Sequence, residues 1–519
     1  GEEAVYFDPA LIIPDQEALR DFYFSYGYFK ERINSKYEID TINGTASIYY
    51  LIDEGSPAIL KSLKISGLDE LPYEFMENVQ SIAAIDTTLP FSGKLIDEKK
   101  NTILTFCRDH GYMLVNTTGA PEVVIDTIKN RVDVSINFTL GNRYKVSDIK
   151  VEKAGDGKDL VEDELVKEVA AIKTDSYYSF FDIQKAQVRL YRTNLFNSAI
   201  ITGIVSDTSG NKVPLNIFTD IGLLHELSPE IIINNEDNVF NLGFGIGYIR
   251  KNFLGGARKF TLSTSAAAQS ITEFITHPSL NDTTVYGYAD VRAILEQPFL
   301  FGQPINTKLE NYLTIQKRKA EYNATLYGIK LSLNFELPRK VFLTSFTTYI
   351  NWEHSRYIYR KQYIIDAFTT LIMNDLNVDQ DSALTIVNQL LSVQSDKSIR
   401  STNAVIGFDF GVNHTDNFFF PTEGYNISLI LEDGNLVPYL FSKMFGYKES
   451  STGYLKTVFT GSAFQTLFNS KQNVLGVKLR AGYVFAYRGD VSLIPLNRRF
   501  YSGGSNSLRG WQSRELVPQ

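Results

Sequence analysis

Residues 329–336 read Ile-Lys-Leu-Ser-Leu-Asn-Phe-Glu, and this stretch decides the fold class. Apolar side chains take one parity and polar side chains the other, Ile329, Leu331, Leu333 and Phe335 against Lys330, Ser332, Asn334 and Glu336. Successive side chains of a β-strand point to opposite faces, so the alternation predicts a strand with one apolar and one polar face. A strand of a transmembrane barrel has this pattern, because one face meets lipid and the other meets a wet lumen.

The alternation recurs through residues 227–519, which we therefore predict to form an antiparallel transmembrane β-barrel. About eleven such segments can be counted, and all but the first are long enough for the roughly 9–11 residues that a tilted spanning strand needs. They are centred near Ile231, Leu242, Leu262, Val291, Leu313, Leu331, Phe346, Phe408, Ile427, Val458 and Leu479. The first, residues 229–234, is expected to be short.

The connections between these segments sort by length. Those on one side are short, at residues 252–256, 297–305, 337–340, 415–424 and 469–472. Those on the other side include the longest, residues 357–400 and 432–450. Bacterial outer-membrane barrels have short periplasmic turns and long external loops, whereas a soluble β-sandwich has no reason to sort its loops by side. Residues 357–400 should form a structured external cap, because helical spacing relates Ala383, Ile386, Val387, Leu390 and Leu391.

Residues 1–226 mix amphipathic helices with short strands and contain a recurring unit, in which helices precede two alternating strands. The repeated signals are Gly27-Tyr28-Phe29, Gly111-Tyr112, Leu190-Tyr191-Arg192-Thr193-Asn194-Leu195-Phe196, and the strand ends Glu54-Gly55 and Leu140-Gly141. This helix-helix-strand-strand unit resembles the POTRA domain. We expect three units, at residues 1–67, 68–148 and 149–226, the first without its opening strand and first helix in this sequence.

Residues 498–511 read Arg-Arg-Phe-Tyr-Ser-Gly-Gly-Ser-Asn-Ser-Leu-Arg-Gly-Trp. This segment resembles the signature loop of the BamA/TamA outer-membrane assembly superfamily, which folds back into the barrel lumen. The residues that carry the resemblance are Gly503, Gly504, Arg509, Gly510 and Trp511. A lumen-facing guanidinium on Arg509 could pair with carboxylates on inner strand faces. Two turns, residues 252–256 and 420–425, also resemble turns of these barrels, and all the pieces stand in the family's order.

The resemblance implies a barrel of about sixteen strands. About eleven fall in this sequence, and the remainder are expected beyond Gln519. It also implies a bacterial outer-membrane protein whose POTRA units lie in the periplasm. Within the superfamily the three short units look closest to the TamA-like lipoprotein branch of Bacteroidota (TamL), although a BamA-like role stays open. The precursor's ends, a lipid anchor and accessory subunits are left open by the sequence.

Composition excludes several other classes of protein. A net charge of -8 without a basic stripe argues against nucleic-acid binding. Cys107 is the only cysteine, so no internal disulfide and no cysteine-based metal cluster can form, and its helical context indicates a core residue. The histidines are scattered without metal-ligand spacing, at positions His110, His225, His277, His354 and His414. We predict no catalytic, metal or cofactor site, and therefore no enzyme.

The expected function is assembly or insertion of other outer-membrane proteins. POTRA units expose strand edges that can receive an unfolded client by β-augmentation, through main-chain hydrogen bonds that demand no particular sequence. In the family the first barrel strand forms a lateral gate, and the matching residues here are Ile231, Ile232, Ile233 and Asn234. The expected partners are unfolded clients, outer-membrane lipid and periplasmic or inner-membrane accessory proteins. The alternatives are a two-partner-secretion transporter and a passive porin or structural surface barrel.

Overall fold

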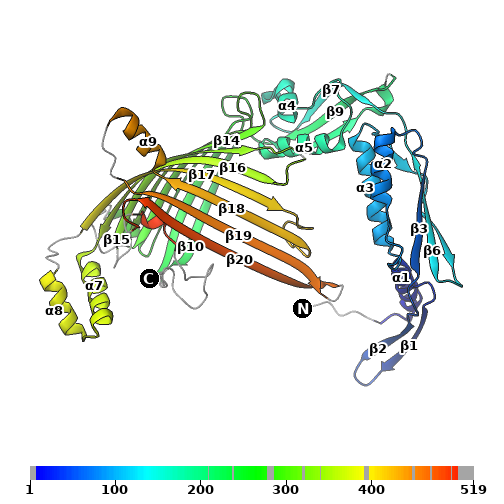
Figure 1. Ribbon diagram of the computed structural model, residues 1–519, viewed down its shortest axis with the longest axis horizontal. Coiled ribbons are helices and arrows are strands. Elements are labelled where there is room, and N and C mark those ends of the chain that lie inside the picture. Colours follow the sequence, from blue (N-terminus) through cyan, green and yellow to red (C-terminus); the bar gives the residue numbers. More distant parts are fainter. Residues whose placement is uncertain are drawn as a thin grey trace. The chain divides into compact units, whose positions relative to one another are not determined.

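The computed structural model (Figure 1) describes residues 7–208, 210–236, 239–276, 286–317, 322–338, 340–390, 397–446, 451–467, 470–491 and 494–500. The chain divides into two compact units. Unit 1 contains Gly1–Glu152, Ala170–Val188 and Ala199–Thr219, and unit 2 contains Lys153–Val169, Arg189–Ser198 and Asp220–Gln519. The α+β region and the large sheet that the sequence predicts are both present.

The first repeat consists of η1 (Pro9–Leu11), α1 (Ile12–Ser25) and a hairpin of β1 (Arg32–Asp40) and β2 (Thr45–Asp53). The two strands pair antiparallel along their whole length, from Arg32 opposite Asp53 to Asp40 opposite Thr45. Gly44 in the turn has a φ of +66°, a conformation that glycine adopts at no steric cost. An Asn-Gly pair is a strong hairpin signal in a sequence, and Asn43-Gly44 here precedes β2 of the hairpin.

The second repeat contains β3 (Ile59–Ser66), α2 (Tyr73–Ala83), α3 (Gly93–Asp109), β4 (Asn116–Thr117), β5 (Glu122–Asp126) and β6 (Arg131–Thr139). Its sheet has the order β3-β6-β4, with β5 also paired to β6. β3 runs parallel to β6 and so belongs to this sheet, although we expected residues 59–66 in the first unit. The core between sheet and helices includes Leu60, Ile103, Cys107, Val132, Val134 and Ile136.

The third repeat follows the same plan, and it spans parts of both units. It contains β7 (Lys145–Ala154), η2 (Lys158–Leu160), α4 (Asp163–Ala170), α5 (Phe180–Arg192), β8 (Phe196–Gly203), η3 (Val205–Asp207) and β9 (Lys212–Ile221). The strand order is β7-β9-β8. The segment from Leu190 to Phe196, which carries the repeat signal, joins the end of α5 to the start of β8.

Unit 2 is built on a sheet of 11 strands, β10 to β20, in which each strand pairs antiparallel with the next. The strands are β10 (His225–Glu236), β11 (Val239–Arg250), β12 (Lys259–Ala268), β13 (Gly287–Gln297), β14 (Ile305–Lys317), β15 (Tyr322–Phe335), β16 (Ser345–Tyr359), β17 (Lys397–Asn413), β18 (Gly424–Gly434), β19 (Gly453–Leu467) and β20 (Ser470–Arg488). The predicted strands and their antiparallel order are confirmed.

The expected short first strand is wrong. β10 has 12 residues and pairs with β11 from His225 opposite Arg250 to Glu236 opposite Val239. Pro229 does not interrupt it, because β10 is an edge of the described sheet and an edge strand tolerates a missing N–H. The strand continues beyond Ile233, because the backbone of residues 234–236 stays paired with β11.

The two faces of the sheet differ as the alternation predicts. Ile329 and Leu331 are exposed on the outer face. Lys330, between them in sequence, lies on the inner face, with Nζ 4.4 Å from the centre of the Tyr349 ring. The strand register carries these parities across the sheet, so that Phe335 of β15, Phe346 of β16 and Phe410 of β17 stack on the outer face.

We call the end of the sheet at which β10 begins the near end. Antiparallel pairing places the connections that follow β11, β13, β15, β17 and β19 there. The other connections lie at the far end and include α6 (Ile271–Thr276). They also include α7 (Lys361–Leu376), α8 (Gln380–Leu390) and α9 (Leu436–Phe445), which are labelled in Figure 1. α8 confirms the helical spacing of Ala383, Ile386 and Val387, while Leu391 lies outside the described residues. No helix in the described ranges is both long and apolar enough to cross a membrane.

Candidate functional site

Two buried carboxylates lie close together on the inner face of the sheet. Glu353 on β16 is 4% exposed and Glu432 on β18 is 8% exposed. The Tyr312 hydroxyl on β14 donates to Glu353 Oε2 at 2.5 Å, and the Tyr349 hydroxyl on β16 donates to Glu432 Oε1 at 2.7 Å. A buried charge needs such hydrogen bonds and a countercharge, so the pair can hold a cation.

That cation is Arg498, at the end of η5 (Leu496–Arg498). Its Nη1 lies 3.6 Å from Glu432 Oε1, and its Nη2 lies 4.0 Å from Glu353 Oε2. The neighbouring Asn497 donates through Nδ2 to Glu353 Oε1 at 2.6 Å. The Asn497 bond has a carboxylate acceptor, which makes it stronger than a neutral hydrogen bond. This bond and the two ion pairs tether the segment before the predicted signature loop to the barrel wall.

Three strand glycines leave room for this arrangement. A Cβ on Gly328 would come within 2.7 Å of the Tyr312 ring, and a Cβ on Gly407 would overlap the Tyr349 ring. A Cβ on Gly482 would overlap the ring of Phe500, which follows the tether. Glycine inside a strand often marks such a close approach, and this is the signal from which these positions could have been found.

The predicted signature residues Gly503, Gly504, Arg509, Gly510 and Trp511 lie outside the described residues. The inward placement expected of Arg509 therefore stays a prediction. From the sequence we expect Arg509 of this segment to meet inner-face carboxylates. The structure adds Arg498, whose partners Glu353 and Glu432 could have been found by extending the parity analysis to β16 and β18.

The predicted gate residues lie on β10, an edge of the described sheet. Ile231 and Ile233 are exposed on the outer face, opposite Phe244 and Leu242 of β11. Ile232 has the inward parity and is partly buried. Asn234 continues the strand opposite Asn241. Whether this strand acts as a gate stays a prediction.

A second candidate site lies on the second repeat, in unit 1. A groove runs between β3 and α2, and its apolar lining includes Leu63, Ile65, Leu71, Met76 and Val79. β3 stands at the end of its sheet, so beyond Leu60 its outer edge has no strand partner within the described part of the chain. An extended peptide could therefore pair with the edge and place side chains in the groove.

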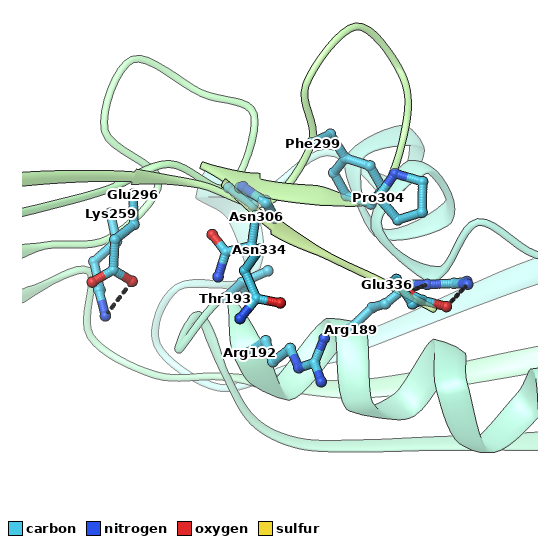
Figure 2. Close-up of a pocket in the computed structure, with 12 residues that line it drawn as sticks. Arg189, Arg192, Thr193, Lys259, Glu296, Phe299, Pro304, Asn306, Asn334 and Glu336 are labelled. Atoms are coloured by element: carbon cyan, nitrogen blue, oxygen red, sulfur yellow. Dashed lines mark hydrogen bonds and ion pairs between the residues drawn. The ribbon is translucent and has the colours of Figure 1, made fainter. Parts of the chain in front are cut away.

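Within unit 2, a polar pocket lies at the near end of the sheet (Figure 2). Arg189 of α5 donates to Glu336 through Nε at 2.8 Å and Nη2 at 2.7 Å, a bidentate pair with both side chains largely buried. Lys259 of β12 forms a second ion pair with Glu296 of β13, at 2.9 Å. Figure 2 shows Arg192 beside them, on the same helix as Arg189. The alternation of residues 329–336 predicts Glu336 on the inner face, whereas no pattern in the sequence indicates Arg189 as its partner.

A family model described as the Omp85 superfamily domain matches residues 252–519, more than half of the chain. The chain belongs to the Omp85 superfamily. A second model, described as a surface antigen variable number repeat of the POTRA type, matches residues 2–55, the first repeat. As an Omp85 protein with POTRA repeats, the chain is an outer-membrane protein whose repeats lie in the periplasm.

Curated relatives of this Omp85 chain include the outer membrane protein assembly factor BamA of Nitratidesulfovibrio vulgaris. It is 19% identical over 568 aligned positions, which cover 98% of this chain and 67% of the relative. BamA of Buchnera aphidicola is 20% identical over 244 positions, covering 47% of this chain and 36% of that protein. The chain thus spans about two thirds of one relative and about a third of the other.

Solved structures similar to this chain include BamA from Haemophilus ducreyi lacking POTRA domains 1–3. The TM-score is 0.48 at 15% identity, covering 89% of this chain and 76% of that one. CdiB from Acinetobacter baumannii gives a TM-score of 0.43 at 12% identity, covering 98% of this chain and 83% of that one.

Proposed function

We propose that this protein is an outer-membrane protein assembly factor, whose POTRA repeats receive unfolded outer-membrane proteins and whose barrel promotes their insertion. The observation that carries the proposal is the open edge of β3 beside the apolar groove of α2, in a repeat joined to an Omp85 barrel domain. Two curated relatives bear the name of assembly factor BamA, which supports the same function.

The groove fits a client strand for a physical reason. An unfolded outer-membrane protein carries alternating apolar and polar side chains, so one face of an added strand would bury apolar groups against Leu63, Ile65 and Met76. Main-chain hydrogen bonds to the β3 edge supply binding that does not depend on client sequence. No cofactor or nucleotide is needed, and the proposed role is not enzymatic.

We further propose that the repeats expected at residues 1–67, 68–148 and 149–226 act as three POTRA repeats, with β3 moved from the first to the second, and that residues 227–519 act as the barrel part. In this proposal Ile231, Ile232, Ile233 and Asn234 form the gate strand. The signature loop, with Gly503, Gly504, Arg509, Gly510 and Trp511, folds into the lumen behind the Arg498 tether. The three short repeats favour the TamL branch of the superfamily, with periplasmic or inner-membrane accessory proteins as further partners.

Site-specific photocrosslinking tests the groove. Benzoylphenylalanine in place of Gln80, which lines the groove on α2, should crosslink to newly exported outer-membrane proteins in cells. Asn78 is the matched control, because it is exposed on the same helix, does not line the groove, and donates to Glu74 O. Crosslinking of equal strength from both positions would contradict a client site in the groove.

Depletion of the protein tests the activity as a whole. The levels of several unrelated outer-membrane barrels should fall together, because main-chain recognition does not select one client. Loss of a single secreted protein, with normal barrel levels, would instead indicate a two-partner-secretion transporter. Unchanged levels of every outer-membrane and secreted protein would indicate a passive barrel.

A further inference from the structure

Exposed apolar side chains gather at the near end of the sheet. Among the described residues, the connections after β11, β13, β15 and β17 each carry at least one, although such turns of outer-membrane barrels face the aqueous periplasm. They are Leu254 after β11, Phe301 after β13, Phe342 after β15, and Phe418, Phe419 and Phe420 after β17. We call these residues the apolar rim. We propose that the apolar rim is embedded in the phospholipid leaflet that surrounds the periplasmic end of the barrel.

The backbone holds part of the apolar rim in conformations that large side chains rarely adopt. Phe301 and Gly302 form a two-residue turn with φ of +52° and +71°, closed by the mutual hydrogen bonds of Leu300 and Gln303. Such a turn strongly prefers asparagine or aspartate before glycine, so phenylalanine there is strained. Leu254 has a φ of +55° in its own turn. Strain at two turn tips that present apolar groups points to a contact made by those groups.

The turn after β17 is rigid rather than a loose apolar loop. Asn417 Oδ1 accepts from the backbone N–H of Phe419 at 2.9 Å and of Phe420 at 3.0 Å. Asp416 Oδ1 accepts from the backbone N–H of Thr422 at 2.8 Å and of Glu423 at 3.0 Å. These bonds satisfy the turn's own backbone and leave the three phenylalanine rings pointing away from it, each at least three-quarters exposed.

Lipid is the occupant that the neighbouring contacts favour, because the apolar rim continues the lipid-facing surface. Phe342 contacts the ring of His414, whose ring contacts Tyr425 on the outer face of β18. After β11, Phe253 precedes Leu254 and stacks at 5.2 Å on Phe260, an outer-face residue of β12. Both chains of rings start from the outer face, and neither leads into the lumen.

Basic side chains stand where lipid phosphates would be. Arg250 is exposed with the outward parity, and its guanidinium lies 5.6 Å from the centre of the Phe253 ring. Arg258 in the same turn donates through Nη1 to Leu254 O at 3.1 Å. Cationic heads beside apolar side chains are typical of segments that lie at a membrane interface.

Spin labelling of the full-length protein in vesicles of phosphatidylethanolamine with a minority of phosphatidylglycerol tests the proposal. Labels replace Phe301 or Phe419 in a Cys107→Ala background. Ile128, in the β5–β6 hairpin of the second repeat, is the matched control, because it is an apolar turn residue as exposed as Phe301, at 93%. Labels at Phe301 and Phe419 should collide several-fold more often with oxygen than with an aqueous nickel complex. The label at Ile128 should show the reverse.

Equal access of the nickel complex to all three labels would overturn the proposal. Protection that appears only after an unfolded outer-membrane protein is added would overturn it as well, because the occupant would then be a protein. Heat-modifiability on gels verifies that each labelled barrel is folded, and Leu254 provides a replacement site where a variant fails. The measurement uses no client, so its result is independent of the proposed assembly function.

Discussion

The second repeat and the β10–β20 sheet use the same alternation of apolar and polar residues in opposite senses. In the repeat, Leu60, Val132 and Val134 point into a shared core and are almost fully buried. In the sheet, Ile329 and Leu331 point outward and are exposed, while charged Glu353 and Glu432 are buried. The comparison teaches that the solvent on the apolar side decides which face is outside, because a strand pattern specifies only that the two faces differ.

The largest loss of barrel stability is expected from substitutions at the buried charges of the inner face. Arg498→Ala would leave Glu353 and Glu432 without their arginine, and breaking a buried pair costs about 3–5 kcal/mol. The unfolding midpoint of the barrel in denaturant should fall accordingly, while the repeats keep their stability. Arg498→Lys should recover only part of the loss, because lysine lacks the planar fork. Wild-type stability of Arg498→Ala would show that the inner face behaves like an ordinary wet surface.

The next largest loss of barrel stability is expected when a charge is placed on the outer face of β15, compared with its inner face. Leu331→Arg places a charge on the outer face and should destabilise the barrel in vesicles by about 2–4 kcal/mol. Ser332→Arg is the control, because it is one residue away and has the inward parity. Its unfolding free energy should stay near that of the wild type. Equal losses for both substitutions would contradict the assignment of the faces.

A smaller effect is expected at the pair of Arg189 and Glu336. A double-mutant cycle with Arg189→Ala and Glu336→Gln should give a coupling of about 1.5 kcal/mol in barrel unfolding, because the pair is bidentate and largely buried. Arg192→Ala is the matched control on the same helix, where the side chain is exposed at the edge of the pocket. A coupling near zero would mean that α5 and β15 contribute independently.

The smallest expected effect concerns the rate at which the Cys107 thiol of the unmutated protein is alkylated. Burial raises the pKa of Cys107 in the repeat core from 9.0 to about 11, so the reactive thiolate is rarer in the folded repeat than in the unfolded one. Alkylation of Cys107 at pH 7 should be slow in the native protein. It should become faster at the denaturant concentration that unfolds the second repeat, which should differ from the concentration that unfolds the barrel. Fast alkylation of the native protein would show that this core is open.

The raised pKa of Cys107 also makes the stability of the second repeat depend on pH. The pKa of Cys107 is higher in the folded repeat than in the unfolded one. The contribution of the protonated thiol to folding stability is therefore complete below pH 9 and is lost as pH rises through about 11. The denaturant midpoint of the second repeat should therefore fall between these values. Cys107→Ala should remove that part of the pH dependence. A fall of equal size in the variant would assign the pH dependence to other groups.

The alternation and the turn residues determined most of the architecture. Residues 329–336 predict which side chains of β15 face outward. The lengths of the connections between strands predict that the long loops lie together at one end of the sheet. The Asn43-Gly44 pair predicts the β1–β2 hairpin. These features depend on interactions within a strand or between neighbouring strands, so the local sequence carries them. The first strand is expected to end at Asn234, because polar residues follow Ile233, but pairing with β11 continues to Glu236.

The tertiary structure alone decided which distant residues meet. The parallel pairing of β3 with β6 follows two intervening helices, and no pattern inside residues 59–66 selects that partner. Glu353, Glu432 and Arg498 also come from separate parts of the chain, and they converge because inward parities on different strands share one face of the sheet. Spacing along the chain reports the direction of a side chain, whereas its partner on that face depends on how the strands are paired and how the sheet curves.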